Sequence, residues 1–170
     1  VSKILGIDNI GKYNFSSSVV SYFVLFSELG ISTYAIREGA KIRKSELIKT
    51  FSNEMFSINI LSTLISYILL GISLIYIPKF QEYNCIILIL SISILFRTIG
   101  MEWIYSIYED YLYITIRSIV IQVLSLVLLF VFVKSKDDLL YYSFLSVFSG
   151  AFTGILNFVH ARKYCKIHFT

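Results

Sequence analysis

Residues 55–77 read MFSINILSTLISYILLGISLIYI and contain no charged side chain. An α-helix rises about 1.5 Å per residue, so about 20 apolar residues cross the hydrocarbon core of a bilayer. The run is long enough to do so. Its length favours a transmembrane helix over a buried helix of a water-soluble domain.

The rest of the chain repeats this pattern. Of its 170 residues, 56% are apolar and 15% charged, whereas soluble domains have about 45–50% and about 25%. Four more apolar runs of near-spanning length occur at residues 13–34, 85–105, 114–133 and 139–159. The predicted fold class is therefore an all-α integral membrane protein, a multi-helix bundle with about five transmembrane helices.

Basic residues are unevenly distributed between these spans. The connection after the first span contains Arg37, Lys41, Arg43, Lys44 and Lys49. A second basic group, Arg162, Lys163 and Lys166, follows the last span. Cytoplasmic loops carry the excess of Lys and Arg, so both segments are predicted to be cytoplasmic. Five alternating spans that start outside satisfy this rule.

The basic segment YAIREGAKIRK, residues 34–44, is itself compatible with a helix. Arg37, Lys41 and Lys44 have helical spacing and would share one face. An apolar stripe beside them would comprise Ile36, Ala40, Leu47, Ile48 and Phe51. This pattern predicts an interfacial amphipathic segment. A topology anchor with no further role is the alternative.

Four ionisable residues lie inside the predicted spans: Glu28, Arg97, Glu102 and Arg117. Charges at membrane depth are costly and tend to mark transport pathways. Arg97 lies about 18 Å and about 12 Å from the two ends of its span, so we expect it to face a polar cavity. Arg117 and Glu102 lie close to span ends, where snorkelling is the simpler explanation.

Glu28 lies about 9 Å from the end of its span, counted at the helical rise per residue. Arg97 and Glu102 are five positions apart on one helix, about 140° around it, and should not pair. Acids are scarce in the spans, so Glu28 is the candidate partner for Arg97.

Other features indicate close helix packing. Asn59, Thr63 and Ser66 recur at helical spacing, which favours hydrogen bonds between helices over a cavity wall. Gly150 and Gly154 form a small-xxx-small pattern, which is typical of close helix contact.

No motif of a soluble enzyme is present, neither a dinucleotide or phosphate loop nor a metalloprotease or nucleophile-elbow signature. We therefore predict a non-enzymatic protein without a cofactor and without a nucleic-acid partner. Cys85 and Cys165 have no Cys or His at ligand spacing, so no metal site is predicted. His160 and His168 lie in the basic tail and are predicted to be solvated or near head groups.

Residues 1–15 are expected to form a loop, because Gly6 and Gly11 interrupt them and several charges keep them polar. They lack the pattern of a signal peptide. An odd number of spans preceded by a loop suggests a piece of a larger protein.

Three stretches resemble one family: LGIDNIGKYNF at 5–15, YFVLFSELGISTYAIREGAKIRK at 22–44 and MEWIYSIYEDYLYITIRSI at 101–119. They are similar to bacterial O-antigen and capsule repeat-unit flippases of the Wzx-like polysaccharide transport family, within the multidrug, oligosaccharidyl-lipid and polysaccharide exporter superfamily. The tail NFVHARKY, residues 157–164, also fits. One departure is that Ser106 and Ile107 stand where family members commonly have Gln-Gly.

The resemblance implies helices two to six of the first of two helix bundles, without the first helix or the second bundle. It implies that an undecaprenyl-diphosphate-linked oligosaccharide crosses the bacterial cytoplasmic membrane through a polar cavity as the two bundles rock. Arg97, Glu28, Arg117 and Glu102 would then line the substrate path. Four basic residues would recruit the head group at the cytoplasmic mouth: Arg37, Lys41, Arg43 and Lys44.

The resemblance also implies membrane lipids, a polysaccharide polymerase and a chain-length regulator as partners. Coupling to H⁺ or Na⁺ is plausible for the family, with Glu28 as a candidate carrier. A drug or small-molecule exporter of the same superfamily is the alternative. A membrane-bound polymerase or glycosyltransferase is a third possibility, but no connection here is long enough for its catalytic loop.

Overall fold

The computed structural model describes residues 5–28, 30–135 and 138–164. No β-strand occurs among them. The helices are α2 (Ile7–Glu28), α3 (Ile31–Ile42), α4 (Leu47–Tyr76), α5 (Pro78–Glu82), α6 (Asn84–Gly100), α7 (Glu102–Tyr108), α8 (Tyr111–Phe132) and α9 (Leu139–Ala161). Five segments are long and apolar enough to cross a membrane: Ile7–Ile42, Leu47–Tyr76, Asn84–Tyr108, Tyr111–Phe132 and Leu139–Ala161. The predicted all-α membrane fold is confirmed.

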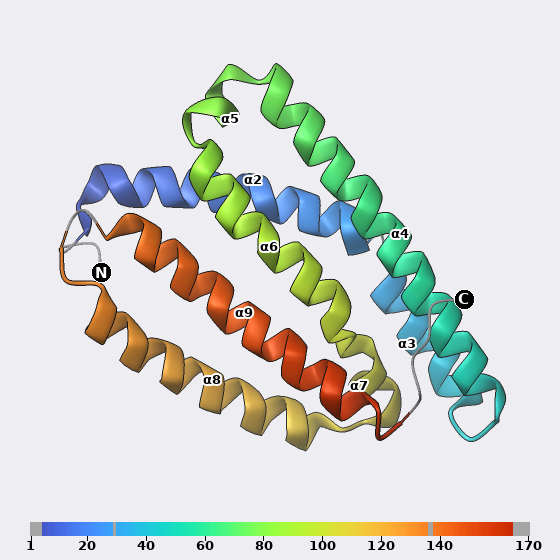
Figure 1. The fold of residues 1–170 in the computed structure, drawn as a ribbon. Helices are drawn as coiled ribbons and strands as arrows, with labels where there is room; N and C mark the ends of the chain where they lie inside the picture. Colours follow the sequence, from blue (N-terminus) through green and yellow to red (C-terminus); the bar gives the residue numbers. More distant parts are fainter. Residues whose placement is uncertain (1–4, 29, 136–137, 165–170) are drawn as a thin grey trace.

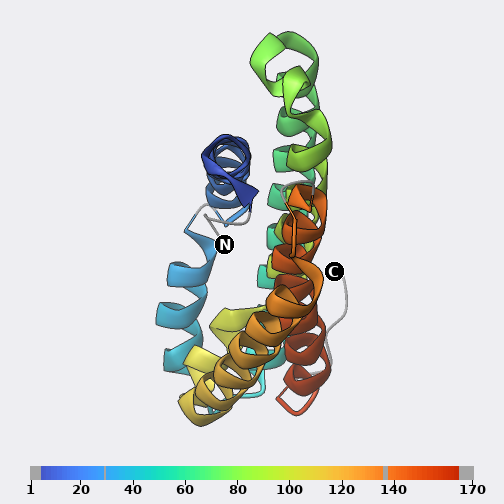
Figure 2. The same cartoon turned by 90° about the vertical axis from the view of Figure 1, so that its left-hand side faces the viewer.

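Helix α6 occupies the middle of the bundle, between α2 and α4 on one side and α9 on the other (Figure 1). Helix α8 lies at the edge and packs mainly on α9. Figure 2 shows α2 and α3 on one side of the layer that α4, α6 and α9 form. Polar residues of α2, α6 and α9 line a pocket between these three helices.

The bundle has two distinct ends. At the basic end, the turn after α3 meets α7, where Arg43 Nη1 donates to the Ile107 carbonyl at 3.2 Å. At the far end, α2 meets α5 and α9, and the rings of Tyr13 and Tyr142 lie 4.7 Å apart. The turn after α3 and the end of α9 thus share the basic end (Figure 1). The distribution of Lys and Arg predicts that these two basic segments lie on the same side of the membrane, and a shared end of the bundle agrees with this.

The loop predicted for residues 1–15 is wrong for the part that the structure describes, because α2 already begins at Ile7. Asp8 lies in its first turn, where a carboxylate is favoured by the helix dipole. Asp8 also pairs with Lys12 at 3.0 Å, one turn further on. Gly11 is accommodated within the helix, so glycine content misled the prediction.

Two of the five segments are broken, which the sequence patterns did not predict. The first breaks between α2 and α3, where Gly30 has a φ of 74° that glycine adopts without strain. The other breaks between α6 and α7 at Met101, which has a φ of 45° although it carries a side chain. Met101 is fully buried. Both breaks place their charged neighbours, Glu28 and Glu102, at helix ends.

Polar residues of α4 join neighbouring helices, as the spacing predicted. The hydroxyls of Thr63 and Thr98 lie 2.6 Å apart, and Ser66 donates to the Phe23 carbonyl at 2.6 Å. These residues bind α4 to α6 and to α2. They contribute to packing and do not line the pocket described below.

Glycine allows two close helix approaches. A Cβ at Gly154 of α9 would collide with the backbone carbonyl of Phe96 in α6, whereas one at Gly150 would meet nothing within 4 Å. Gly39 of α3 similarly makes room for the side chain of Ile107 in α7. Only one glycine of the Gly150–Gly154 pair is therefore needed for the contact.

The face that α3 buries differs from the predicted stripe. Its buried residues are Ile31, Ala35 and Gly39. In the predicted stripe, Ile48 is buried and Ile36 and Phe51 are partly buried, whereas Ala40 and Leu47 are exposed. The helix also ends at Ile42, so Lys44 lies beyond it. The contact with α7 selects small residues, which a hydropathy pattern does not reveal.

Candidate functional site

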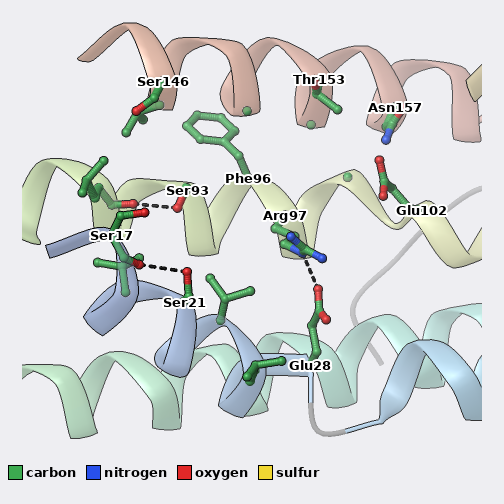
Figure 3. Close-up of a pocket in the computed structure, with 18 of the residues that line it drawn as sticks. Ser17, Ser21, Glu28, Ser93, Phe96, Arg97, Glu102, Ser146, Thr153 and Asn157 are labelled. Atoms are coloured by element: carbon green, nitrogen blue, oxygen red, sulfur yellow. Dashed lines mark hydrogen bonds and ion pairs between the residues drawn. The ribbon is translucent and has the colours of Figure 1, made fainter. Parts of the chain in front are cut away.

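An open pocket of about 520 Å³ lies between α2, α6 and α9. Figure 3 shows its polar side chains in three rows, one from each helix, with Glu102 from the start of α7. The labelled residues that line it are Ser17, Ser21, Glu28, Ser93, Phe96, Arg97, Glu102, Ser146, Thr153 and Asn157. The pocket thus combines an ionic end with hydroxyl groups that lie among apolar side chains such as Val20 and Leu90.

Arg97 of α6 and Glu28 of α2 form an ion pair across the pocket (Figure 3). The side chains are 60% and 28% exposed. The pairing expected from the scarcity of acids in the spans is confirmed. Because the guanidinium remains accessible, a ligand in the pocket can reach it.

Glu102 and Arg117 form a second ion pair, with 2.9 Å between Oε1 and Nη2. Arg117 does not snorkel: its side chain is only 5% exposed. It also donates to Asn157 Oδ1 of α9. Arg117 is therefore held behind the pocket wall, and only Glu102 and Asn157 of this group line the pocket.

Asn157 was not singled out as a site residue from the sequence. It is completely buried, and its Nδ2 has no hydrogen-bond partner among the residues that the structure describes. Buried amide groups usually find a partner. A ligand in the pocket could reach this donor only if the side chain moved, because Asn157 is completely buried. The signal available in the sequence was an Asn inside a predicted membrane span.

The four predicted recruitment residues divide into two groups. Arg37 and Lys41 are exposed on α3, and both pair with Glu38, at 3.0 Å and 2.9 Å. Arg43 instead pairs with Glu109 at 3.0 Å and so joins the turn after α3 to the end of α7. Lys44 is exposed in that turn. Glu38 reduces the net charge of the segment, which counting only basic residues overlooks.

A cluster of aromatic and titratable side chains closes the basic end between α8 and α9. The ring of His160 stacks on Tyr113 with 3.8 Å between centroids, and its Nε2 lies 3.3 Å from Asp110 Oδ2. Tyr164 also donates to Asp110. His160, predicted to be solvated or near head groups, is partly exposed, at 30%, and the stacking and this hydrogen bond hold it in the cluster. His168 and Cys165 lie outside the described residues.

The hydrogen bonds that Asp110 receives, first from Tyr164 and then from His160, hold the pKa of its carboxyl below the usual range. Burial, and secondly the bond to Asp110, raise the pKa of Tyr164 to about 12. The cluster therefore keeps Asp110 charged and Tyr164 protonated near neutral pH.

Within the described residues, no group of three or more His, Cys, Asp or Glu side chains could hold a metal ion. The site instead offers one accessible guanidinium, two carboxylates, an amide and several hydroxyls. This set can bind a polar, partly anionic ligand by hydrogen bonds and charge, without covalent chemistry.

The chain was also compared with protein families, with curated proteins and with solved structures. A family model described as "Polysaccharide biosynthesis protein" matches residues 1–170. The chain is 24% identical over 156 residues to an Escherichia coli (strain K12) protein named "Putative O-antigen transporter". The match covers 91% of this chain and 37% of that protein, so the chain spans little more than a third of its relative. No solved structure matches the chain.

The five apolar segments indicate a multi-pass membrane protein. Because the family model matches the whole chain, the chain belongs to the polysaccharide biosynthesis protein family.

Proposed function

We propose that this chain is part of a non-enzymatic flippase of the bacterial cytoplasmic membrane. Its cargo would be undecaprenyl-diphosphate-linked oligosaccharide repeat units for O-antigen, capsule or exopolysaccharide assembly. The observation that carries the proposal is the accessible Arg97–Glu28 pair in an open polar pocket between helices long enough to cross a membrane. A polar cargo needs such a path, because hydrocarbon provides no partners for its charged and hydroxyl groups.

In this proposal the diphosphate binds at the ionic end of the pocket. Guanidinium and phosphate form strong, charge-assisted hydrogen bonds. Arg97 would exchange its contact with Glu28 for one with the phosphate, a change favoured by the exposure of both side chains. The lipid tail stays in the bilayer while the oligosaccharide occupies the pocket.

The basic segment, residues 34–44, would attract the cargo before the cargo enters the pocket. Arg37, Lys41 and Lys44 are exposed and can attract anionic head groups within a Debye length of the membrane surface. Arg43 has a structural contact instead. Membrane lipids, a polymerase and a chain-length regulator are the partners proposed for the whole protein, and H⁺ or Na⁺ is its proposed coupling ion.

The test uses the complete protein in a bacterial strain whose own repeat-unit flippase is deleted, with surface polysaccharide as the readout. Restoration by the parent, and its loss in an Arg97→Ala variant inserted at an equal level, is the expected result. Arg97→Lys, which keeps the charge, should retain part of the transport. Arg162→Ala is the matched control, because it removes a cation near the basic end but outside the pocket.

Failure of the parent to restore polysaccharide with cargo from its own source strain would contradict the proposal. Efflux of small organic cations by the same protein would then favour the drug-exporter alternative.

A further inference from the structure

We propose that the half of the pocket beyond Arg97 binds neutral, hydroxyl-rich sugar units and discriminates against acidic ones. This inference rests on the proposed function and specifies the class of cargo. It is carried by the direction of the hydrogen bonds in the pocket wall and by the charges that line it.

Three hydroxyl groups of the wall already donate their protons to their own helices. Ser21 donates to the Ser17 carbonyl at 2.8 Å, Ser93 to Leu90 at 2.6 Å and Thr153 to Ser149 at 2.9 Å. A hydroxyl has one proton and two lone pairs. With the proton used, these oxygens offer acceptors to the pocket.

Near the far end of the pocket, hydroxyl protons are likewise already used in hydrogen bonds within the protein. Ser146 donates to the Ser143 carbonyl at 3.0 Å and accepts from Tyr13 at 3.1 Å. The tyrosine proton is therefore also in use. Helices α2, α6 and α9 all present hydroxyl oxygens to the same space in Figure 3.

A wall of acceptors requires a ligand with donors. Sugar hydroxyls can donate, whereas an ionised carboxylate or phosphate can only accept. An acidic sugar placed here would face lone pairs, or would break the hydrogen bonds that the wall already makes. An unsatisfied buried polar group costs about 1–3 kcal/mol, which is sufficient for selection between otherwise identical sugars.

The charges lining the pocket act in the same direction. Among the described residues that line it, Arg97 is the one cation, and Glu28 and Glu102 are both acids. Arg117 neutralises Glu102 from behind but does not line the pocket. Once Arg97 engages a diphosphate, this wall has no cation left for a second anion.

The donors of Arg97 lie at the ionic end of the pocket, where Thr153 also lies, while Ser93 and Ser146 lie further along it (Figure 3). Ser17 lies eleven positions before Glu28 in α2, or about 16 Å along the helix. The two ends would therefore contact different parts of one cargo, with phosphate acceptors at the donors and sugar donors at the acceptors.

The experiment measures binding to the complete protein, purified in lipid nanodiscs. Two synthetic polyprenyl-diphosphate-linked disaccharides serve as probes, identical except that the terminal hexose of one is replaced by the corresponding uronic acid. We expect the neutral probe to bind about tenfold more tightly, the discrimination produced by one unsatisfied polar group.

Ser21→Lys should reduce this preference, because it adds a cation to the wall. Ser18→Lys is the matched control: Ser18 is exposed on the same helix but does not line the pocket, so the preference should persist. Equal binding of both probes, or tighter binding of the acidic one, would overturn this inference while leaving the proposed function intact. If neither probe binds, the proposed function fails and the inference fails with it.

Discussion

Arg97 and Arg117 both lie inside apolar helices, and each pairs with a glutamate from another helix, yet their surroundings are opposite. Arg97 is 60% exposed in an open pocket, whereas Arg117 is 5% exposed and bound to both Glu102 and Asn157. The first pair is available to a ligand. The second fixes the junction of α7, α8 and α9. The same residue type thus serves binding in one place and structure in the other.

Glu102→Ala should produce the largest loss of stability, because it leaves the buried Arg117 without its carboxylate partner. Glu102 is itself 55% exposed, so the loss should be about 1–3 kcal/mol, the cost of leaving a buried polar group without its partner. Thermal unfolding of the complete protein in detergent measures the loss. Glu102→Gln, which keeps an acceptor oxygen, should be milder. An unchanged unfolding temperature for Glu102→Ala would mean that Arg117 does not depend on this pair.

Gly154→Ala should come next, because its Cβ would collide with the Phe96 carbonyl and push α9 away from α6. Overpacking of this kind costs about 1–3 kcal/mol. Since α6 and α9 form two walls of the pocket, transport should fall as well. Gly150→Ala is the control, because a methyl group there meets nothing within 4 Å. Equal losses of stability in Gly154→Ala and Gly150→Ala would contradict the close contact between Gly154 and Phe96.

Glu28→Ala should change stability by less than about 1 kcal/mol, because exposed ion pairs contribute little. The same thermal unfolding assay measures it beside Glu102→Ala. Transport should nevertheless change, since Arg97 would lose its resting partner. A loss of stability as large as that of Glu102→Ala would remove the distinction between the two arginines.

The smallest expected effect is a change in stability with pH, caused by Asp110 at the basic end. The pKa of Asp110 is lowered in the folded protein, so its stabilising contribution is present above the ordinary value of 3.8 and is lost as the pH falls through the folded value. The stability difference between the parent and Asp110→Asn should therefore be full at pH 7 and shrink below about pH 4. Unfolding measured across this range tests the sign. A difference that grows with acidity contradicts it.

The apolar spans were predictable because hydropathy and length reflect the requirement to cross a bilayer. Residues 55–77, for example, fall almost entirely within α4, Leu47–Tyr76. The break at Met101 was not predictable, because nothing in the composition marks that residue for a positive φ. Gly30 offered a better signal, since glycine favours such positions.

The candidate site was only partly predictable. The Arg97–Glu28 pair followed from the depth of Arg97 and the scarcity of acids in the spans. The burial of Arg117 was missed, because distance along its own helix says nothing of α7 and α9 packing over it. The acceptor wall was also missed. Serines in a span indicate polarity, but only the structure gives the direction of their hydrogen bonds.

Cargo protection of a single cysteine tests the account most directly. The complete protein would carry Ser93→Cys in the pocket, with Cys85 and Cys165 replaced by Ser, and would be exposed to a water-soluble thiol reagent. Rapid labelling that lipid-linked oligosaccharide slows is the predicted result. A protein that retains only Cys85, which is exposed and outside the pocket, should label equally with and without cargo. Labelling of the pocket cysteine that cargo does not slow would contradict the account.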